Sequence, residues 1–278
     1  MTKAQTLAGM RSALKWAGGK KKVVNEIASL LPIKGKKRLV EPFVGGGSVF
    51  LNLDFDEYLL VDMNKDLINL FNIIKNQPAK FITDAQKYFQ GDNNQPEKYY
   101  DLRSQFNQST DPYERSLLFL YLNRHGYNGL CRYNKSGGYN VPFGRYKHPY
   151  FPKEELQYFS KKATNATFIQ GDFETAFAQL KANDVVYCDP PYSPINPTSN
   201  FTAYAGNSFT DDDQRRLVEY AEIARSKKIP TLISNHYVDF TRDLYQGASK
   251  KKLFQVQRTI SQKGKGRIKV KEVLALYK

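Results

Sequence analysis

A carboxylate followed by two prolines and a tyrosine is the segment of this sequence best suited to chemistry. Asp189-Pro-Pro-Tyr192 comes directly after the apolar run Val185-Val-Tyr-Cys188. A residue before proline is held in extended backbone conformations, and each proline fixes its own φ angle. The segment is therefore predicted to be a stiff turn that presents a carboxylate, a backbone carbonyl and an aromatic face. The alternative for the segment taken alone is a strand-ending turn with a surface aspartate.

A glycine-rich turn followed by an acid is the second candidate for ligand binding. Glu41-Pro-Phe-Val-Gly-Gly-Gly47 follows one predicted strand, and Asp62 ends the next. Glycines let a backbone turn approach a ligand closely, and an acid at the tip of the second strand suits a ribose diol. The sequence lacks GxxxxGK[ST] and the third glycine of GxGxxG, which disfavours an NTPase phosphate cradle and a dinucleotide site. A turn that only reverses the chain is the alternative.

The basic residues are concentrated in two stretches. The chain has 42 Lys and Arg against 27 Asp and Glu, a net charge of +15. Residues 115–153 contain no acid, seven basic residues and nine Phe or Tyr, and residues 250–271 contain no acid and nine basic residues. A solvated surface normally mixes both signs, so a basic stretch interleaved with aromatics favours nucleic-acid binding. The alternatives are a hydrophobic subdomain with a basic rim, and charge that serves solubility alone.

Composition excludes several other classes of protein. The two cysteines, Cys131 and Cys188, form no CxxC pair, which argues against a zinc ribbon or a disulfide framework and favours a reducing compartment. The longest strongly apolar run, 117–122, is too short to span a bilayer, and the N-terminus has no apolar signal region. We therefore expect an intracellular, soluble protein. Three scattered histidines do not suggest a metal site: His125, His148 and His236.

Strands that alternate with helices at the two ends of the chain must position these segments. That alternation predicts an α/β fold with a mostly parallel sheet, in which ligands bind at the carboxyl ends of the strands. The middle, about residues 63–160, is predicted to be helical, with a β-hairpin around Lys135-Ser-Gly-Gly138. Helices are predicted at 67–75, 116–124 and 210–226, the last capped by Thr210. The predicted strands are 38–41, 58–62, 167–170, 184–188, 229–234, 253–260 and 272–277.

Four segments, in order along the chain, resemble the D12 class of DNA adenine-N6 methyltransferases of the alpha group. Within that class the sequence is similar to the Dam family, which methylates adenine in GATC. The resemblance covers residues 12–278, whereas the head MTKAQTLAGMR matches nothing in the family. The four segments are Leu14-Lys-Trp-Ala-Gly-Gly-Lys20, Phe43-x-Gly45-x-Gly47, the stretch from Leu120-Tyr-Leu-Asn-Arg to Asn140-Val-Pro-Phe-Gly-Arg-Tyr146, and Asp189-Pro-Pro-Tyr192.

The resemblance implies a Rossmann-like S-adenosylmethionine-dependent methyltransferase sheet with an inserted helical domain that carries the hairpin. It implies a catalytic domain of residues 12–62 and 161–278 and an inserted DNA target-recognition domain of residues 63–160. The implied reaction moves a methyl group from S-adenosyl-L-methionine to N6 of adenine in double-stranded DNA, leaves S-adenosyl-L-homocysteine and uses no metal. The target adenine is expected to be flipped out, because N6 is unreachable for this geometry inside a duplex. The default expectation is a monomer in a bacterial or phage-like cytoplasm.

The tetrapeptide after Cys188 supplies groups for this reaction. The N6 lone pair is delocalised into the adenine ring, so the amine is a poor nucleophile. The Asp189 carboxylate and the Pro190 carbonyl can each accept one N6 hydrogen, which turns the lone pair toward the donor and stabilises the developing charge. Tyr192 is expected to stack on the flipped base. By resemblance, Trp16 packs on the donor's adenine. The other donor-site residues that the resemblance implies are Lys20, Phe43, Gly45, Gly47, Asp62 (at the ribose), Asp172 and Asp189.

The predicted hairpin supplies the candidate base-reading residues. The planar fork of Arg132 suits a guanine edge. The resemblance places Leu130 and Pro142 with Arg132 at base edges, and Lys15 at the first guanine. The loop 193–209 has no charged residue and is expected to close over the target base. The other implied DNA contacts are Tyr127 and Asn128 near the gap left by the flipped base, and Arg103, Arg124, Asn134, Asn140, Arg145 and Tyr146, most of them at the backbone.

Four rival functions remain open at this point. Methyltransferases that act on RNA or on a protein glutamine usually carry Asn at the first position of the tetrapeptide, where this chain has Asp189. Cytosine-N4 methyltransferases typically carry Ser there. A non-catalytic DNA-binding regulator with the same fold is disfavoured because Asp189, Tyr192 and the glycine turn are intact. A restriction nuclease is disfavoured because no cluster of metal-binding acids is evident.

Overall fold

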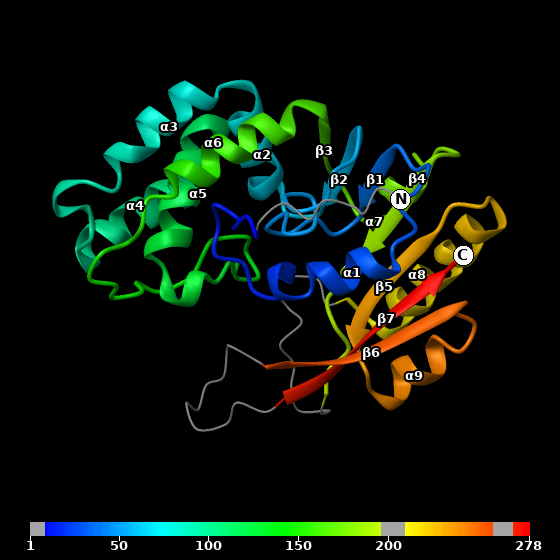
Figure 1. Cartoon of the computed structure of the whole chain (residues 1–278). Coiled ribbons are helices and arrows are strands. Elements are labelled where there is room, and N and C mark those ends of the chain that lie inside the picture. The colour runs from blue at the N-terminus through cyan, green and yellow to red at the C-terminus, as the bar shows by residue number, and fades with distance from the viewer. Residues whose placement is uncertain (1–8, 196–208, 258–268) are drawn as a thin grey trace.

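A seven-stranded sheet forms the centre of the computed structural model, which describes residues 9–195, 209–257 and 269–278 (Figure 1). The strand order is β3-β2-β1-β4-β5-β7-β6. Neighbours pair in parallel from β3 to β5, whereas β7 pairs antiparallel with both β5 and β6. The predicted α/β fold with a mostly parallel sheet is confirmed. The strands are β1 (Arg38–Glu41), β2 (Glu57–Asp62), β3 (Ala166–Gln170), β4 (Asp184–Cys188), β5 (Thr231–His236), β6 (Lys250–Gln257) and β7 (Lys269–Tyr277).

Helices cover both faces of the sheet, which explains why β1 and β4 are buried along their whole length. Side chains alternate between the faces along a strand. Leu39 therefore lies in one core with Ile27 of α1, whereas Val40 lies in the other with Leu217 of α8. None of the helices in the described part of the chain is long and apolar enough to cross a membrane. The helices are α1 (Val24–Leu30), α2 (Lys65–Asn76), α3 (Pro78–Lys87), α4 (Pro96–Gln108), α5 (Pro112–His125), α6 (Lys153–Lys162), α7 (Phe173–Phe177), α8 (Asp211–Ser226) and α9 (Asp239–Leu244).

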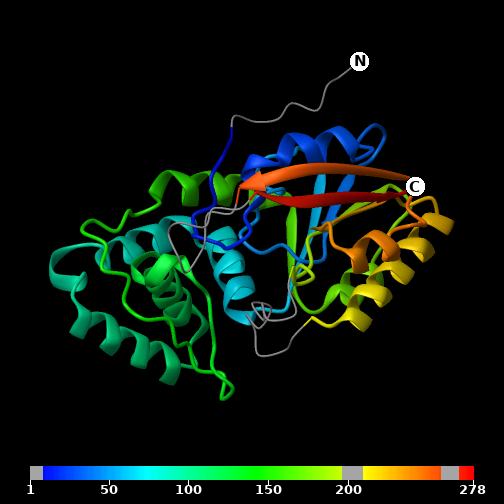
Figure 2. The same ribbon diagram turned by 90° about the horizontal axis from the view of Figure 1, so that it is seen from below.

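Helices α2 to α6, the helical cluster, gather at the β3 end of the sheet, in the connection between β2 and β3 (Figures 1 and 2). At its centre is α5, in which every residue from Ser116 to His125 is buried. A helix buried on all sides is apolar all round, which is the pattern that predicted it. It begins before the predicted segment because Asp111 caps it, accepting a hydrogen bond from Tyr113 N. The limits 63–160 for an inserted domain stay a prediction.

Residues 130–143, the hairpin, reverse direction as predicted but form isolated bridges in place of two continuous strands. Asn134 N donates to Gly138 O at 2.8 Å, and Tyr133 bridges to Tyr139. Beyond the turn, Asn107 of α4 binds both backbone polar groups of Tyr139, at 2.7 and 3.1 Å. Side-chain bonds of this kind replace the ladder that a strand would form. The hairpin is therefore attached to the helical cluster through its backbone.

The segment that precedes α1 runs between the helical cluster and the sheet (Figure 1). Lys15 N donates to Asn123 Oδ1 at 2.8 Å, and Asn123 Nδ2 donates back to Lys15 O at 2.8 Å. Asn123 belongs to α5, so these two bonds fix the segment to the middle of the cluster. Five residues further along, Lys20 reaches the turn that follows β4. The N-terminal motif thus contacts both parts of the molecule.

Candidate active site

The glycine turn (residues 41–47) and the acid at the end of β2 meet at the carboxyl edge of the sheet, where the parallel strands end. Gly45 N donates to Asp62 Oδ2 at 2.9 Å, and Asn64 N donates to Asp62 Oδ1 at 2.9 Å. Burial raises the pKa of Asp62, and these two N–H groups offset part of the rise. Backbone donors therefore hold both oxygens of the carboxylate in one orientation.

Trp16 lies directly against the glycine turn. A Cβ atom on Gly45 would be 2.7 Å from Trp16 Nε1, and one on Gly46 would be 2.8 Å from Trp16 Cβ. Gly45 and Gly47 also have φ angles of +47° and +73°, in the left-handed region that favours glycine. The turn needs these glycines because a side chain would displace the indole or strain the backbone. The structure thus brings together four of the predicted donor-site residues, Trp16, Gly45, Gly47 and Asp62.

The carboxylate of Asp189 is joined to the N-terminal motif. Lys20 Nζ is 2.9 Å from Asp189 Oδ1, and Ser234 Oγ donates to the same oxygen at 2.9 Å. Lys20 is only 8% exposed and also donates to Gly18 O at 2.9 Å. Both contacts orient the carboxylate through Oδ1. Ser234 could not be predicted from the sequence, because its place beside Asp189 depends on the register of β4 with β5, in which Cys188 pairs with Ile233.

The ring of Tyr192 contacts Lys20 and His236. Lys20 Nζ is 4.6 Å from the centroid of the Tyr192 ring, and the centroid of the His236 ring is 4.8 Å away, edge-on. The Tyr192 hydroxyl donates to Glu272 Oε2 at 3.3 Å. Burial, and then the charge of Asp189, raise the pKa of Tyr192 well above its usual value. The hydroxyl therefore stays neutral and serves as an anchor for the ring.

Glu41, the first residue of the glycine turn, is a second buried carboxyl group near Asp189. It is 2% exposed, and its Oε1 has no hydrogen-bond partner among the described residues. Burial, followed by the charge of Asp189, raises the pKa of Glu41 well above its usual value. A buried polar atom without a partner is uncommon in proteins. In the sequence alone, Glu41 is recognisable only as the first residue of the glycine turn.

Two further donor-site candidates lie where the glycine turn meets α7. The ring of Phe43 stacks on Phe173, with centroids 5.9 Å apart. Asp172 Oδ1 caps α7, accepting from Thr175 N and Thr175 Oγ1 at 2.9 Å each. Asp172 therefore has a role in holding α7, and its contact with the donor stays a prediction.

The hairpin and the short segment before it carry exposed side chains. Arg132 Nε donates to Asn140 Oδ1 at 2.7 Å, and Arg132 Nη2 donates to Asn140 O at 3.2 Å. Tyr127 is 51% exposed, and the neighbouring Asn128 is exposed with a φ angle of +53°. Tyr127 N donates to Pro142 O at 2.9 Å. The predicted base-edge and gap residues are thus exposed, except Leu130, which is half-buried.

Three basic residues expected at the DNA have contacts within the protein. Lys15 Nζ donates to Arg124 O at 3.1 Å and lies 3.5 Å from the centroid of the Tyr146 ring. Burial, and then the charge of Arg124, lower the pKa of Lys15 to about 8. Arg124 is 8% exposed and donates to two backbone carbonyls, and Arg103 donates to a carbonyl of the hairpin at 3.0 Å. These side chains hold backbone within the protein, and their contacts with DNA stay predictions.

The remaining residues predicted to contact DNA differ in their surroundings, and some lie outside the described part of the chain. Asn134 Oδ1 accepts from Ser136 N and Gly138 N and so holds the hairpin turn. Arg145 is exposed and has a φ angle of +53°. The loop 193–209, expected to close over the target base, lies mostly outside the described residues, as does 258–268 of the second basic stretch. Among the described residues, no group of three or more His, Cys, Asp or Glu side chains is placed to hold a metal ion.

Residues 16–261 match the family model described as D12 class N6 adenine-specific DNA methyltransferase. The chain belongs to this family. It is 54% identical over 268 residues to the DNA adenine methylase of Vibrio cholerae, with 96% of each chain covered. It is 53% identical over 268 residues to the DNA adenine methylase of Escherichia coli, with 96% of this chain and 95% of that one covered. The activity of the family is N6-adenine methylation of DNA, as the sequence predicted.

In this D12 methyltransferase, the residues at the carboxyl edge fit the methyl donor that a methyltransferase of this family implies, S-adenosylmethionine. A carboxylate held by backbone donors, Asp62, suits a ribose diol. The indole of Trp16 provides an apolar face beside the glycine turn. Glu41 Oε1, which has no partner among the described residues, is a buried polar atom that a ligand or a water can satisfy.

Proposed function

We propose that this protein methylates N6 of the adenine in GATC within double-stranded DNA, after that adenine has been flipped out of the duplex. The observation that carries the proposal is the convergence of three predicted motifs at one edge of the sheet. Lys20 of the first motif lies 2.9 Å from Asp189 of the last, and Trp16 lies on the glycine turn between them in sequence. The close similarity to two DNA adenine methylases supports the same reaction on the same kind of substrate.

The donor, S-adenosylmethionine, supplies a methyl group made electrophilic by the sulfonium and leaves as S-adenosylhomocysteine. In the proposed site Trp16 packs on the donor's adenine and Asp62 accepts hydrogen bonds from its ribose hydroxyls. Two backbone N–H groups hold Asp62 in one orientation, which preorganises it for that role. The glycine turn carries no side chain that would block the approach. The other residues proposed for this site are Lys20, Phe43, Gly45, Gly47, Asp172 and Asp189.

Asp189 and Pro190 are proposed to activate the adenine amine. Each accepts one N6 hydrogen, so the lone pair localises on nitrogen and points at the methyl carbon. The contacts from Lys20 and Ser234 engage Asp189 Oδ1, and the second oxygen is the one assigned to N6. Tyr192 stacks on the flipped base, with its hydroxyl anchored by Glu272. Alignment of nitrogen, methyl and sulfur supplies the rest of the acceleration.

The helical cluster is proposed to read the DNA. Residues 63–160 are assigned to target recognition, and residues 12–62 and 161–278 to catalysis by a monomer. Arg132 is the proposed guanine reader, with Leu130 and Pro142 at neighbouring base edges and Lys15 at the first guanine. Asn140 holds the Arg132 guanidinium from one side, which leaves a fixed direction for base contact. The remaining proposed contacts are Arg103, Arg124, Tyr127, Asn128, Asn134, Asn140, Arg145 and Tyr146.

Transfer of a labelled methyl group to a duplex with a single GATC tests the proposal. Asp189→Ala should abolish methyl transfer, because Asp189 is assigned to activation of the adenine amine. Duplex binding, followed by gel shift, should stay within about threefold of wild type, because the proposed DNA contacts are made by other residues. Asp212→Ala is the matched control, since its side chain is 90% exposed on α8, and it should transfer at the wild-type rate. Retained turnover in Asp189→Ala would overturn the catalytic assignment. Equal rates on a GATC-free duplex would overturn the target sequence.

A further inference from the structure

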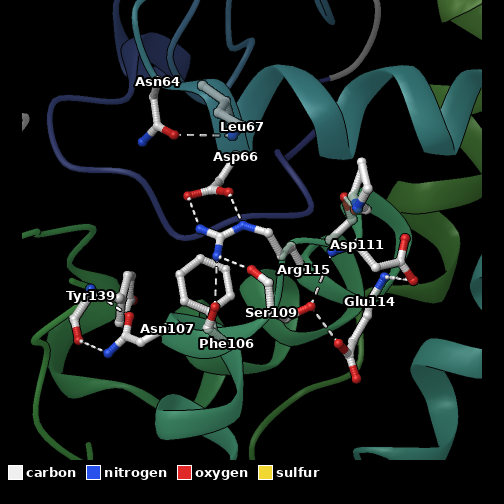
Figure 3. Close-up of polar contacts among 12 residues, drawn as sticks. Asn64, Asp66, Leu67, Phe106, Asn107, Ser109, Asp111, Glu114, Arg115 and Tyr139 are labelled. Carbon is white, nitrogen blue, oxygen red and sulfur yellow. Dashed lines mark hydrogen bonds and ion pairs between the residues drawn. The ribbon is translucent and has the colours of Figure 1, made fainter. Parts of the chain in front are cut away.

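Asp66, in the first turn of α2, is the acceptor at the centre of a buried polar cluster (Figure 3). The residue is 6% exposed. Arg115 Nε donates to Asp66 Oδ1 at 2.9 Å, and Arg115 Nη2 donates to Oδ2 at 3.0 Å. The hydroxyl of Tyr133 donates to the same Oδ2 at 2.7 Å. One carboxylate therefore joins α2, α5 and the hairpin.

The other side of the Arg115 guanidinium holds the end of α4. Arg115 Nη1 donates to Phe106 O at 2.7 Å and to Ser109 O at 2.9 Å (Figure 3). Between these two carbonyls lies Asn107, which binds the backbone N and O of Tyr139. Tyr139 bridges to Tyr133 across the hairpin. The cluster thus reaches both arms of the hairpin, one through a hydroxyl and the other through α4.

Asn64, two residues before Asp66, makes a second attachment. Its side chain caps α2 by accepting from Leu67 N at 3.1 Å (Figure 3). Its Nδ2 donates to Cys131 Sγ at 3.3 Å, and its backbone N–H donates to Asp62 Oδ1. The five residues from Asp62 to Asp66 therefore bind the hairpin at two points and hold the acid assigned to the donor ribose.

Arg132 lies between the two attached residues of the hairpin. Cys131 is buried and Tyr133 half-buried, whereas Arg132 is exposed. Successive side chains of an extended segment point to opposite sides, so fixing Cys131 and Tyr133 toward α2 directs Arg132 outward. Asn140 then fixes the guanidinium from the opposite arm.

We propose that Asn64 and Asp66 are positioning residues for target specificity, which set the place of Arg132 relative to the carboxyl edge of the sheet. This inference rests on the proposed function, in which Arg132 reads a guanine. The turn after β2 would then give the readout and the donor site a common reference point. A base-reading fork has to be held to a fraction of an ångström to discriminate between base edges. The alternative is that the polar cluster around Asp66 only stabilises the helical cluster and has no effect on specificity.

Tyr133→Phe distinguishes a positioning role from a purely stabilising one. It removes one hydroxyl and leaves the Asp66–Arg115 ion pair and the aromatic ring in place. We expect kcat on a GATC duplex to change less than twofold. The ratio of kcat/KM on GATC to kcat/KM on a site altered at one guanine should fall by about tenfold, within the range that one bidentate base contact supplies. Tyr158→Phe is the matched control: its hydroxyl donates to Leu51 O at 3.1 Å, away from the hairpin. It should lose similar thermal stability and keep full discrimination.

A double-mutant cycle with Arg132→Ala tests whether the effect passes through Arg132. In that background, Tyr133→Phe should cause no further loss of discrimination; an additive loss would overturn the positioning role. Hydrogen exchange provides a readout that needs no catalysis: the Asn140 amide, bonded to Arg132 O at 3.1 Å, should exchange faster in Tyr133→Phe than in Tyr158→Phe. Equal discrimination and equal exchange in the two variants would overturn this inference. A wild-type enzyme with no preference for GATC would instead overturn the proposed function.

Discussion

Alanine at Gly45 should displace Trp16 from the glycine turn, whereas alanine at Gly47 should not. A Cβ atom on Gly45 would be 2.7 Å from Trp16 Nε1 and 3.2 Å from Trp16 Cδ1. A Cβ atom on Gly47 would meet nothing closer than 3.5 Å. Both positions have a left-handed backbone, with φ angles of +47° and +73°. The pair of variants therefore shares the backbone penalty and differs in the collision with the indole.

The size of each effect follows from these contacts. A left-handed conformation costs a non-glycine residue roughly 1–2 kcal/mol, so both variants should lose about that much free energy of unfolding. Non-bonded heavy atoms are best placed about 3.5 Å apart, so in Gly45→Ala the indole has to move by several tenths of an ångström to relieve the 2.7 Å contact with Trp16 Nε1. Stacking of an aromatic side chain on a base is worth about 1–3 kcal/mol. Loss of that contact should weaken donor binding by roughly fivefold to 150-fold.

Trp16 is the only tryptophan in the chain, so its fluorescence reports directly on the site. The assay is a titration of wild type, Gly45→Ala and Gly47→Ala with S-adenosylhomocysteine, followed by quenching of that emission. Gly47→Ala should keep the wild-type emission maximum and bind within about threefold of wild type. Gly45→Ala should show a red-shifted maximum in the absence of ligand and bind weakly. Thermal unfolding of both variants provides the stability baseline.

Two outcomes would refute this reasoning. Equal weakening in both variants would mean that the backbone strain, and not the collision with Trp16, controls donor binding. Wild-type affinity in Gly45→Ala, together with a shifted emission maximum, would remove Trp16 from the donor site.

Two further predictions concern stability in acid and target readout. Burial lowers the pKa of His125 from 6.5 to about 4, so between these values the unfolded chain takes up a proton that the folded chain does not. The free energy of unfolding should therefore fall by up to about 3 kcal/mol as the pH drops through that window. His125→Gln should flatten the profile of urea midpoint against pH in the same window. An unchanged slope would contradict the lowered pKa of His125. Arg132→Ala should relax specificity at one base pair by roughly 1–3 kcal/mol, measured as methyl transfer to duplexes altered at single positions, and an unchanged preference would remove Arg132 from the readout.

The central strands were predictable because burial on both faces makes them apolar throughout. The predicted strands 38–41 and 184–188 coincide with β1 and β4. The edge of the sheet was less predictable: β6 begins at Lys250, three residues before the predicted start, because an edge strand carries polar side chains that show no apolar pattern. β5 begins at Thr231, after Pro230, since proline cannot donate to a ladder.

Some residues of the candidate site are also recognisable in the sequence, whereas others are not. The glycine turn and Asp189 are recognisable in the sequence because glycine and proline restrict the local backbone. Ser234 and Asp66 are not, since one depends on the register of β5 against β4 and the other on how α2 packs against α5. A serine in a strand and an aspartate in a helix carry no local signal of such partners. Residues that orient other residues are therefore the part of a site that spacing along the chain does not reveal.

The proposed base reader and the proposed catalytic residues are connected by packing and not by a flexible linker. The chain leaves Asp62 and enters α2 within three residues, and one continuous core contains Leu67 of α2, Leu118 of α5 and Leu60 of β2. The N-terminal segment makes the same connection a second time, bonded to α5 at Asn123 and to Asp189 through Lys20. Two separate attachments restrict rotation of the helical cluster about either one. The proposed guanine reader on the hairpin, Arg132, is therefore held at a nearly fixed distance from the carboxyl edge of the sheet.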